Sequence, residues 1–218
     1  HIGMGAMIAM VLYSLWISRD HLRDVWRGAK GEKVNDTNEI LSYKAAFWGL
    51  VFGSLFLTIW LTISGMSWYI AFLFLIFAFI IWIILTRIVC EGGIPTLVAT
   101  TIASSQIISM FGSKNLTPLT LVALGLTYVY AADLRTFPLA STSMGLKIVE
   151  PAKSKRPIFW AIFLAIVINI IATIYLQLKL GYKYGGINLN GWYFGGGAQA
   201  PYKYISEMIK HQTSPNGI

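Results

Sequence analysis

The sequence predicts an all-α, polytopic transmembrane helix bundle with about six crossings, one of them in a broken or short helix. Of the 218 residues, 56% are hydrophobic and 12% are charged, whereas a soluble globular domain carries about 25% charged residues. The mean hydropathy is +0.64, and the apolar residues are gathered in long runs. Because so few charges cannot cover a surface that faces water, the chain is expected to be an integral membrane protein.

Residues 1–180 are expected to form the transmembrane bundle. A helix needs about twenty apolar residues to cross a bilayer. The segments that come close to this length are Ile2–Ile17, Tyr43–Ile63, Trp68–Ile88, Ile94–Met110, Leu116–Ala132 and Ile158–Leu180. Ile94–Met110 is short and rich in polar residues, so it could instead be a re-entrant hairpin that returns to the side it left.

The distribution of basic residues favours six crossings. If all six segments cross, twelve Lys and Arg residues fall on one side and five on the other, a bias typical of the cytoplasmic side. A re-entrant segment would move the cluster from Arg135 to Arg156 outside and remove this asymmetry. The expected location is therefore the cell membrane, as a multi-pass protein with both chain ends outside. The chain opens inside an apolar run without an initiator Met, and it is interpreted as a fragment of a larger membrane protein.

Residues 19–42 are expected to form a cytoplasmic loop that contains an interfacial helix. Arg19, Arg23 and Arg27 repeat every four residues beside an apolar strip that includes Trp26. This pattern is typical of a helix that anchors to the membrane surface, with Trp at headgroup depth and arginines toward lipid phosphate. The alternative is a docking surface for a partner protein.

Residues 181–218 are rich in Gly and aromatic residues. Glycines at 185–186 and 195–197 disfavour regular helix, so we expect an external loop followed by a short helix near Ala200–Lys210. The expected partners of the whole chain are the lipid bilayer, the remaining helices of a longer chain or neighbouring membrane subunits, and a small polar solute. No nucleic acid is expected, because the net charge of +8 is explained by basic residues in cytoplasmic loops.

The stretch RIVCEGGIPT is the first candidate for a functional site. Arg87 and Glu91 are four residues apart, so on a helix they share one face and can form an ion pair. An unpaired charge at membrane depth costs about 2.5–3.5 kcal/mol on insertion scales, and pairing makes both residues tolerable there. Three residues that favour helix termination follow: Gly92, Gly93 and Pro95.

Polar side chains come directly after this predicted break: Thr96, Thr100, Ser104 and Gln106. Irregular backbone at membrane depth persists only inside protein or against a water-filled cavity, and interrupted helices form substrate and ion sites in many transporters. The sequence therefore predicts a polar cavity for a solute or ion. The alternative is an ordinary cytoplasmic helix end, with Arg87 as an anchor and Glu91 in water.

Asp133 is the second candidate, because it directly follows an apolar segment and could bind an ion or a proton. It could equally pair with Arg135 or Lys147 at the membrane surface. The single cysteine, scattered histidines and missing triad, P-loop or dinucleotide patterns lead us to expect no metal, no cofactor and no enzymatic activity.

Several stretches resemble a large uncharacterised family of bacterial multi-spanning membrane proteins: the helix end Thr86–Gly93, the opening MVLYSLWISRDHLRDVWRGA and Leu41-Ser42-Tyr43. This resemblance covers nearly the whole chain and implies a multi-pass membrane topology in the bacterial cytoplasmic membrane. AADLRTFPLASTSMGLKI is more loosely similar to a segment of oligopeptide and metal-chelate transporters in which A-x-D-L precedes a Lys-Gly pair. Ala132-Asp133-Leu134 match, but Gly145 precedes Lys147.

The expected function is therefore part of a secondary transporter for a small polar or peptide-like solute. The alternative is a structural or accessory subunit of a membrane protein complex without transport activity.

Overall fold

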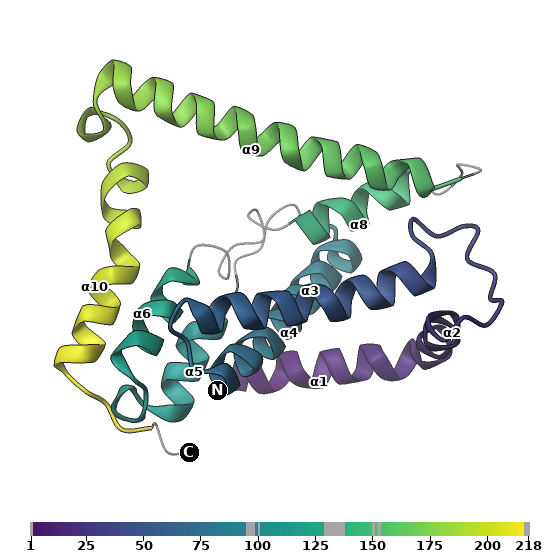
Figure 1. Cartoon of the computed structure of the whole chain (residues 1–218), viewed down its shortest axis with the longest axis horizontal. Helices are drawn as coiled ribbons and strands as arrows, with labels where there is room; N and C mark the ends of the chain where they lie inside the picture. The colour runs from purple at the N-terminus through teal and green to yellow at the C-terminus, as the bar shows by residue number, and fades with distance from the viewer. Residues whose placement is uncertain are drawn as a thin grey trace.

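The computed structural model describes residues 2–94, 99, 101–128, 138–149, 151 and 154–215. These residues form nine α-helices and no strands, so the all-α prediction is confirmed. Figure 1 shows α1, α3 and α9 extending between two ends of the molecule, with α10 lying across one end and α2 at the other. We call these the α10 end and the α2 end.

Helices α1 (Ile2–Ile17) and α2 (Arg19–Ala29) meet at an angle of 69°. The helix predicted after the first segment is thus present. It packs on the start of α3 (Tyr43–Ile63), where the rings of Trp26 and Phe47 meet edge to face at 5.2 Å. Gly28 allows this approach, because a Cβ atom there would lie 2.8 Å from the Cβ atom of Tyr43.

Helix α4 (Trp68–Gly92) is the centre of the bundle and contacts α1, α3, α5 and α8. Its apolar side chains dominate the hydrophobic core, with Phe74, Ile81 and Leu85 fully buried. Helix α3 before it begins and ends as predicted, and Ser42 caps its start by accepting a hydrogen bond from the Ala45 amide at 3.3 Å.

The next two helices are short, which corrects the expectation of about six spanning helices. Both α5 (Ala103–Phe111) and α6 (Pro118–Leu126) have nine residues and are about 13 Å long, less than half of the hydrocarbon core. Three described helices, α3, α4 and α9, are long and apolar enough to cross a membrane, or four if the bent pair α1–α2 is one span. A left-handed Gly112 at φ +72° and Pro118 at the start of α6 create helix ends that hydropathy alone does not register.

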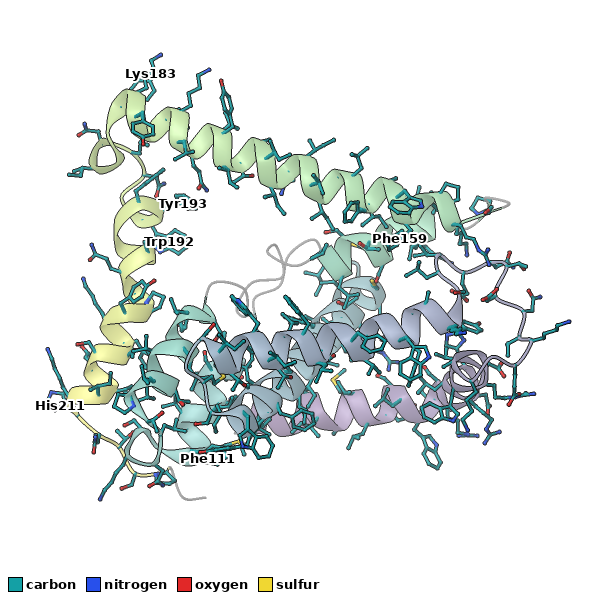
Figure 2. The ribbon with its side chains drawn as sticks, viewed as in Figure 1. Phe111, Phe159, Lys183, Trp192, Tyr193 and His211 are labelled. Carbon is teal, nitrogen blue, oxygen red and sulfur yellow. The ribbon has the colours of Figure 1, made fainter. Side chains whose placement is uncertain are left out.

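Helices α8 (Pro138–Ile148) and α9 (Arg156–Tyr184) follow. The 29-residue α9 has no buried residue, and Figure 2 shows its side chains standing out on all sides between Phe159 and Lys183. After a 3₁₀ turn at Gly186–Asn188 comes a π-helical turn, Trp192–Gly196.

The last helix, α10 (Gly197–Lys210), begins three residues before the predicted Ala200, so the glycines at 195–197 do not prevent helical backbone. It packs closely on α6, since a Cβ atom at Gly125 would lie 2.7 Å from Cγ1 of Ile205. Together with α5, this makes α6 one of the most buried parts of the molecule.

Polar contacts define which helix termini meet at the α2 end. Arg156, at the start of α9, forms an ion pair with Asp36 at 3.3 Å, and the other oxygen of Asp36 accepts a hydrogen bond from the Tyr43 amide at 3.3 Å. Arg87, near the end of α4, donates to the hydroxyl of Ser14, near the end of α1. The starts of α3 and α9 and the ends of α1 and α4 therefore lie at this end.

At the opposite side of the bundle, the start of α4 meets the start of α6. The Ser67 amide donates to Oγ1 of Thr120 at 3.2 Å. The turn between α5 and α6, including the 3₁₀ turn Ser113–Asn115, contacts the residues after α10, where the Lys114 amide donates to the Thr213 carbonyl at 3.2 Å. The α5–α6 turn therefore lies at the α10 end.

Candidate functional site

The ion pair of the RIVCEGGIPT stretch is present on α4. Arg87 Nε lies 2.6 Å from Oε1 of Glu91, and the side chains are 28% and 61% exposed. Arg87 also donates through Nη1 to the Ser14 hydroxyl. An exposed i,i+4 pair contributes about 0.3–0.5 kcal/mol, so the pair itself adds little stability, whereas the contact with Ser14 joins α4 to α1.

The helix ends where the sequence predicted a break. Gly93 adopts a left-handed conformation, φ 62° and ψ 23°, and its amide donates to the Val89 carbonyl at 3.0 Å. A Cβ atom at Gly93 would meet nothing within 4 Å, so glycine is favoured by backbone conformation and not by crowding. Pro95, Thr96, Thr100 and Asp133 lie outside the described residues, and their proposed roles stay predictions.

Ser104 and Gln106 lie in the first half of α5 and are only 3% and 7% exposed. Ser104 Oγ is buried without a hydrogen-bond partner, as are Oγ1 of Thr101 and Oγ1 of Thr86 on α4. The side-chain amide of Gln106 has no hydrogen-bond partner among the described residues, although its backbone amide is bonded within α5. An unmade hydrogen bond of a buried polar group costs about 1–3 kcal/mol, so this concentration of unpartnered groups calls for a functional explanation.

Other buried hydroxyls nearby are paired, which makes the contrast informative. Oγ1 of Thr120 accepts a hydrogen bond from the Ser67 amide, and the Thr127 hydroxyl donates to the Leu124 carbonyl at 2.6 Å. Ser105, adjacent to Ser104, donates to the Ile102 carbonyl at 2.9 Å. The packing of this region therefore satisfies most hydroxyls and leaves out a specific few.

The α5–α6 hairpin lies at the α10 end, where Figure 1 shows α6 beside α10. The ends of the hairpin away from its turn are the N-terminus of α5 and the C-terminus of α6. We call them its deep ends, because Ala103, Ser104, Leu124 and Thr127 are buried there. Sequence reasoning placed a short polar helix over Ile94–Met110, whereas α5 begins only at Ala103.

The residues after α10, His211–Pro215, pack against the α5–α6 turn, and the sequence did not indicate this contact. We call them the C-terminal tail. The Thr213 amide donates to Oγ of Ser113 at 2.9 Å, and a Cβ atom at Gly112 would lie 2.5 Å from the Pro215 nitrogen. These residues are about a hundred positions apart, and no local pattern connects them.

Two pockets are formed by other parts of the molecule. One of about 580 Å³ lies between α8 and α9 and is lined by Ser141, Thr142 and Asn169 among apolar residues. Another of about 260 Å³ lies between α6 and α10, with Lys210 in its lining. Neither pocket is lined by Arg87 or Glu91, so these two cavities are not the one predicted beside the ion pair.

The predicted membrane anchor is an exposed surface in which the arginines have acidic neighbours. Arg23 lies 3.9 Å from Asp20. Arg27 Nε lies 2.6 Å from Oε2 of Glu32, and this hydrogen bond raises the pKa of the Arg27 guanidinium. Trp26 is half exposed, while Arg19 stacks over the ring of the preceding Trp16, 5.1 Å from its centroid.

Within the residues that the structure describes, no group of three or more His, Cys, Asp or Glu side chains is arranged to hold a metal ion. The one cysteine, Cys90, is free and exposed.

No curated protein and no solved structure matches the chain. The looser similarity to oligopeptide and metal-chelate transporters therefore gains no support from these comparisons, and neither does a bacterial origin. The model of a family of unknown function, DUF6785, matches residues 2–218, in agreement with the predicted uncharacterised family. The chain therefore belongs to the DUF6785 family of unknown function.

Proposed function

We propose that this chain forms the solute pathway of a multi-pass membrane transporter for a small polar solute. The observation that carries the proposal is the α5–α6 hairpin, whose deep end holds buried hydroxyl groups without partners beside α4. Discontinuous helices that end inside the bundle are a recurrent way to build substrate sites in secondary transporters. Polar groups at this depth are costly unless function retains them.

The positions of the helix termini support two further crossings beside the long helices. Helix α4 ends at the α2 end, the α5–α6 turn lies at the α10 end, and α9 begins at the α2 end. In the proposal, the chain passes through the membrane between Gly92 and Gly112 and returns before Arg156. Each passage contains one nine-residue helix, which preserves the predicted six crossings with two of them discontinuous.

The remaining candidate residues have supporting roles in this proposal. Arg87 and Glu91 fix the end of α4 against α1, and Asp133 is retained as an ion or proton ligand. Trp26 and the exposed arginines of α2 hold the α2 end at the lipid headgroups, which corresponds to the cytoplasmic face by the positive-inside rule.

Thiol labelling tests the topology in a Cys90→Ser background, which removes the one native thiol. Lys33→Cys, at the α2 end, should react from one side of sealed vesicles, and Ile187→Cys, beyond α9, from the other. Labelling of both positions from the same side would overturn the crossing of α9.

Uptake by proteoliposomes tests the transport activity. A mixture of amino acids, dipeptides and small organic acids is offered, and the internal solutes are identified by mass spectrometry. Ser104→Ala should reduce uptake of the recovered solute, whereas Ser143→Ala, whose hydroxyl donates to the Leu139 carbonyl at 2.8 Å within α8, should not. Equal reduction by both variants, or no uptake of any solute, would contradict the proposal.

A second candidate function, that of a structural subunit of a membrane complex, is favoured by α9. Small or polar residues recur at every fourth position along this unburied helix, and such stripes promote close helix association in membranes: Ala161, Ala165, Asn169, Thr173, Gln177 and Gly181. The protein mass of particles extracted from native membranes in mild detergent, after correction for bound detergent, should then exceed the 24.3 kDa of the chain. Thr173→Trp, in the part of the stripe outside the α8–α9 pocket, should lower this protein mass, whereas Ile171→Trp, outside the stripe, should leave it unchanged.

A further inference from the structure

We infer that the N-terminal turn of α5 binds a carboxylate group, so that the solute is a small organic anion. This inference rests on the proposed function and adds the charge class of the solute. Three independent features of the described residues support it: the helix terminus, the unpartnered hydroxyls and the local distribution of charge.

The first feature is the helix itself. The nine residues of α5 begin at Ala103, at the deep end of the hairpin. The first amides of a helix have no acceptor within the helix, and they carry partial positive charge. The turn is well formed here, because the Gln106 amide donates to the Ile102 carbonyl at 3.1 Å. Such a terminus is suited to a negative group.

The second feature is a pair of hydroxyls at this terminus. Ser104 is more than nine-tenths buried, and its Oγ has no partner; Oγ1 of Thr101, three residues earlier, is also buried without a partner. Thr101 directly precedes the extended N-cap residue Ile102, and Ser104 is the second residue of α5, so the two hydroxyls flank the start of the helix. Both hydroxyls are available as donors, whereas the neighbouring Ser105 hydroxyl is already used within the chain.

The third feature is the absence of acidic residues from this part of the sequence. Between Gly92 and Tyr128 the only charged residue is Lys114, which lies at the far end of α5, in the turn. A cation site would ordinarily use carboxylate ligands, and this segment has none. The donors present, amides and hydroxyls, are suited to an anion.

The absence of Arg and Lys near the start of α5 also favours a carboxylate over a phosphate ester as the bound group. Phosphate groups carry nearly two negative charges and are ordinarily bound by Arg or Lys. The deep end of the hairpin offers a helix terminus equivalent to about half a positive charge and neutral donors, which matches one negative charge better than two.

Binding to the full chain in lipid nanodiscs tests this inference with acetate, propionate and butyrate. The neutral amides of the same shape and inorganic phosphate serve as comparisons. Isothermal titration should give binding of at least one carboxylate, with affinity at least about tenfold higher than for its amide. Ser104→Ala and Thr101→Val should each weaken carboxylate binding about tenfold, whereas Ser143→Ala should not.

The outcomes separate this inference from the proposed function. Equal affinity for amide and carboxylate, tighter binding of phosphate, no binding of any of the acids, or binding that both substitutions leave unchanged would overturn the carboxylate site. Ser104-dependent uptake of a neutral or cationic solute would keep the transport proposal and overturn the charge class. Ser104-dependent carboxylate binding without uptake by proteoliposomes would keep the site and overturn transport. If Ser104→Ala does not fold, the Thr101→Val result decides.

Discussion

Helix α9 and the two helices of the α5–α6 hairpin come from sequence segments that were all expected to cross the membrane, yet they have opposite environments. No residue of α9 is buried, whereas half or more of each short helix is. Hydropathy measures how favourably a segment leaves water, and this free energy is similar whether the segment then faces lipid or the protein interior. The difference shows that apolar sequence identifies the membrane-embedded part of a chain without identifying its core.

The largest expected effect comes from removing the same side chain in the two regions. Ile107 on α5 is 0% exposed and Ile170 on α9 is 52% exposed. Ile107→Ala should lower the free energy of unfolding by about 2–5 kcal/mol, because it leaves a cavity. Ile170→Ala should change it by less than about 0.5 kcal/mol. Unfolding by SDS titration in mixed micelles measures both, and similar losses would show that α9 is covered in the folded protein.

A glycine in the hairpin turn should be nearly as sensitive. Gly112→Ala places a Cβ atom against the backbone of the C-terminal tail and forces a left-handed conformation on an alanine, which together should cost at least about 2 kcal/mol. Gly53→Ala is the control, because a Cβ atom in the middle of α3 would meet nothing within 4 Å. Thermal unfolding in detergent provides the comparison. An unchanged melting temperature for Gly112→Ala would mean that the tail is not docked on the turn.

The ion pair of α4 should show a smaller and asymmetric effect. Arg87→Leu removes both the pair with Glu91 and the hydrogen bond to Ser14, and we expect a loss of about 1–2 kcal/mol. Ser14→Ala in the same assay isolates the contact between helices. A loss for Arg87→Leu no greater than that for Glu91→Gln would contradict the role of Arg87 in joining α4 to α1.

The smallest expected effect on stability is that of Glu91→Gln, less than about 0.5 kcal/mol. The side chain is mostly exposed, and the amide can still accept a hydrogen bond from Arg87. Transport, in contrast, should fall if Glu91 takes part in solute or ion binding, and uptake by proteoliposomes measures this separately. Unchanged uptake would mean that Glu91 has no part in solute or ion binding and that the RIVCEGGIPT stretch only ends a helix.

Local sequence signals were sufficient for much of this fold. Helix α3 was predicted over its observed range, and the Arg87–Glu91 pair and the break at Gly93 follow from spacing and from glycine conformation. Helix α9 was predicted over Ile158–Leu180 but extends over Arg156–Tyr184, because polar residues such as Lys183 can continue a helix past the hydrocarbon region.

The errors arose where contacts distant in sequence decide the structure. The run Leu116–Ala132 gave no hydropathic sign that a helix ends at Leu126. The bonds of Arg87 with Ser14 and of Ser113 with Thr213 connect residues 73 and 100 positions apart. Burial of Ser104 also depends on packing between helices, so its unpartnered hydroxyl could not be deduced from the sequence.

The docked C-terminal tail determines how the α5–α6 hairpin can move. Its turn is tethered on two sides, to the start of α4 through Thr120 and to the tail through Ser113. Gly125, near the end of α6, is held as well, against Ile205 of α10, so α10 and the residues after it fix both ends of this short helix. Removal of the tail is therefore expected to release the α5–α6 turn while α6 stays packed on α10.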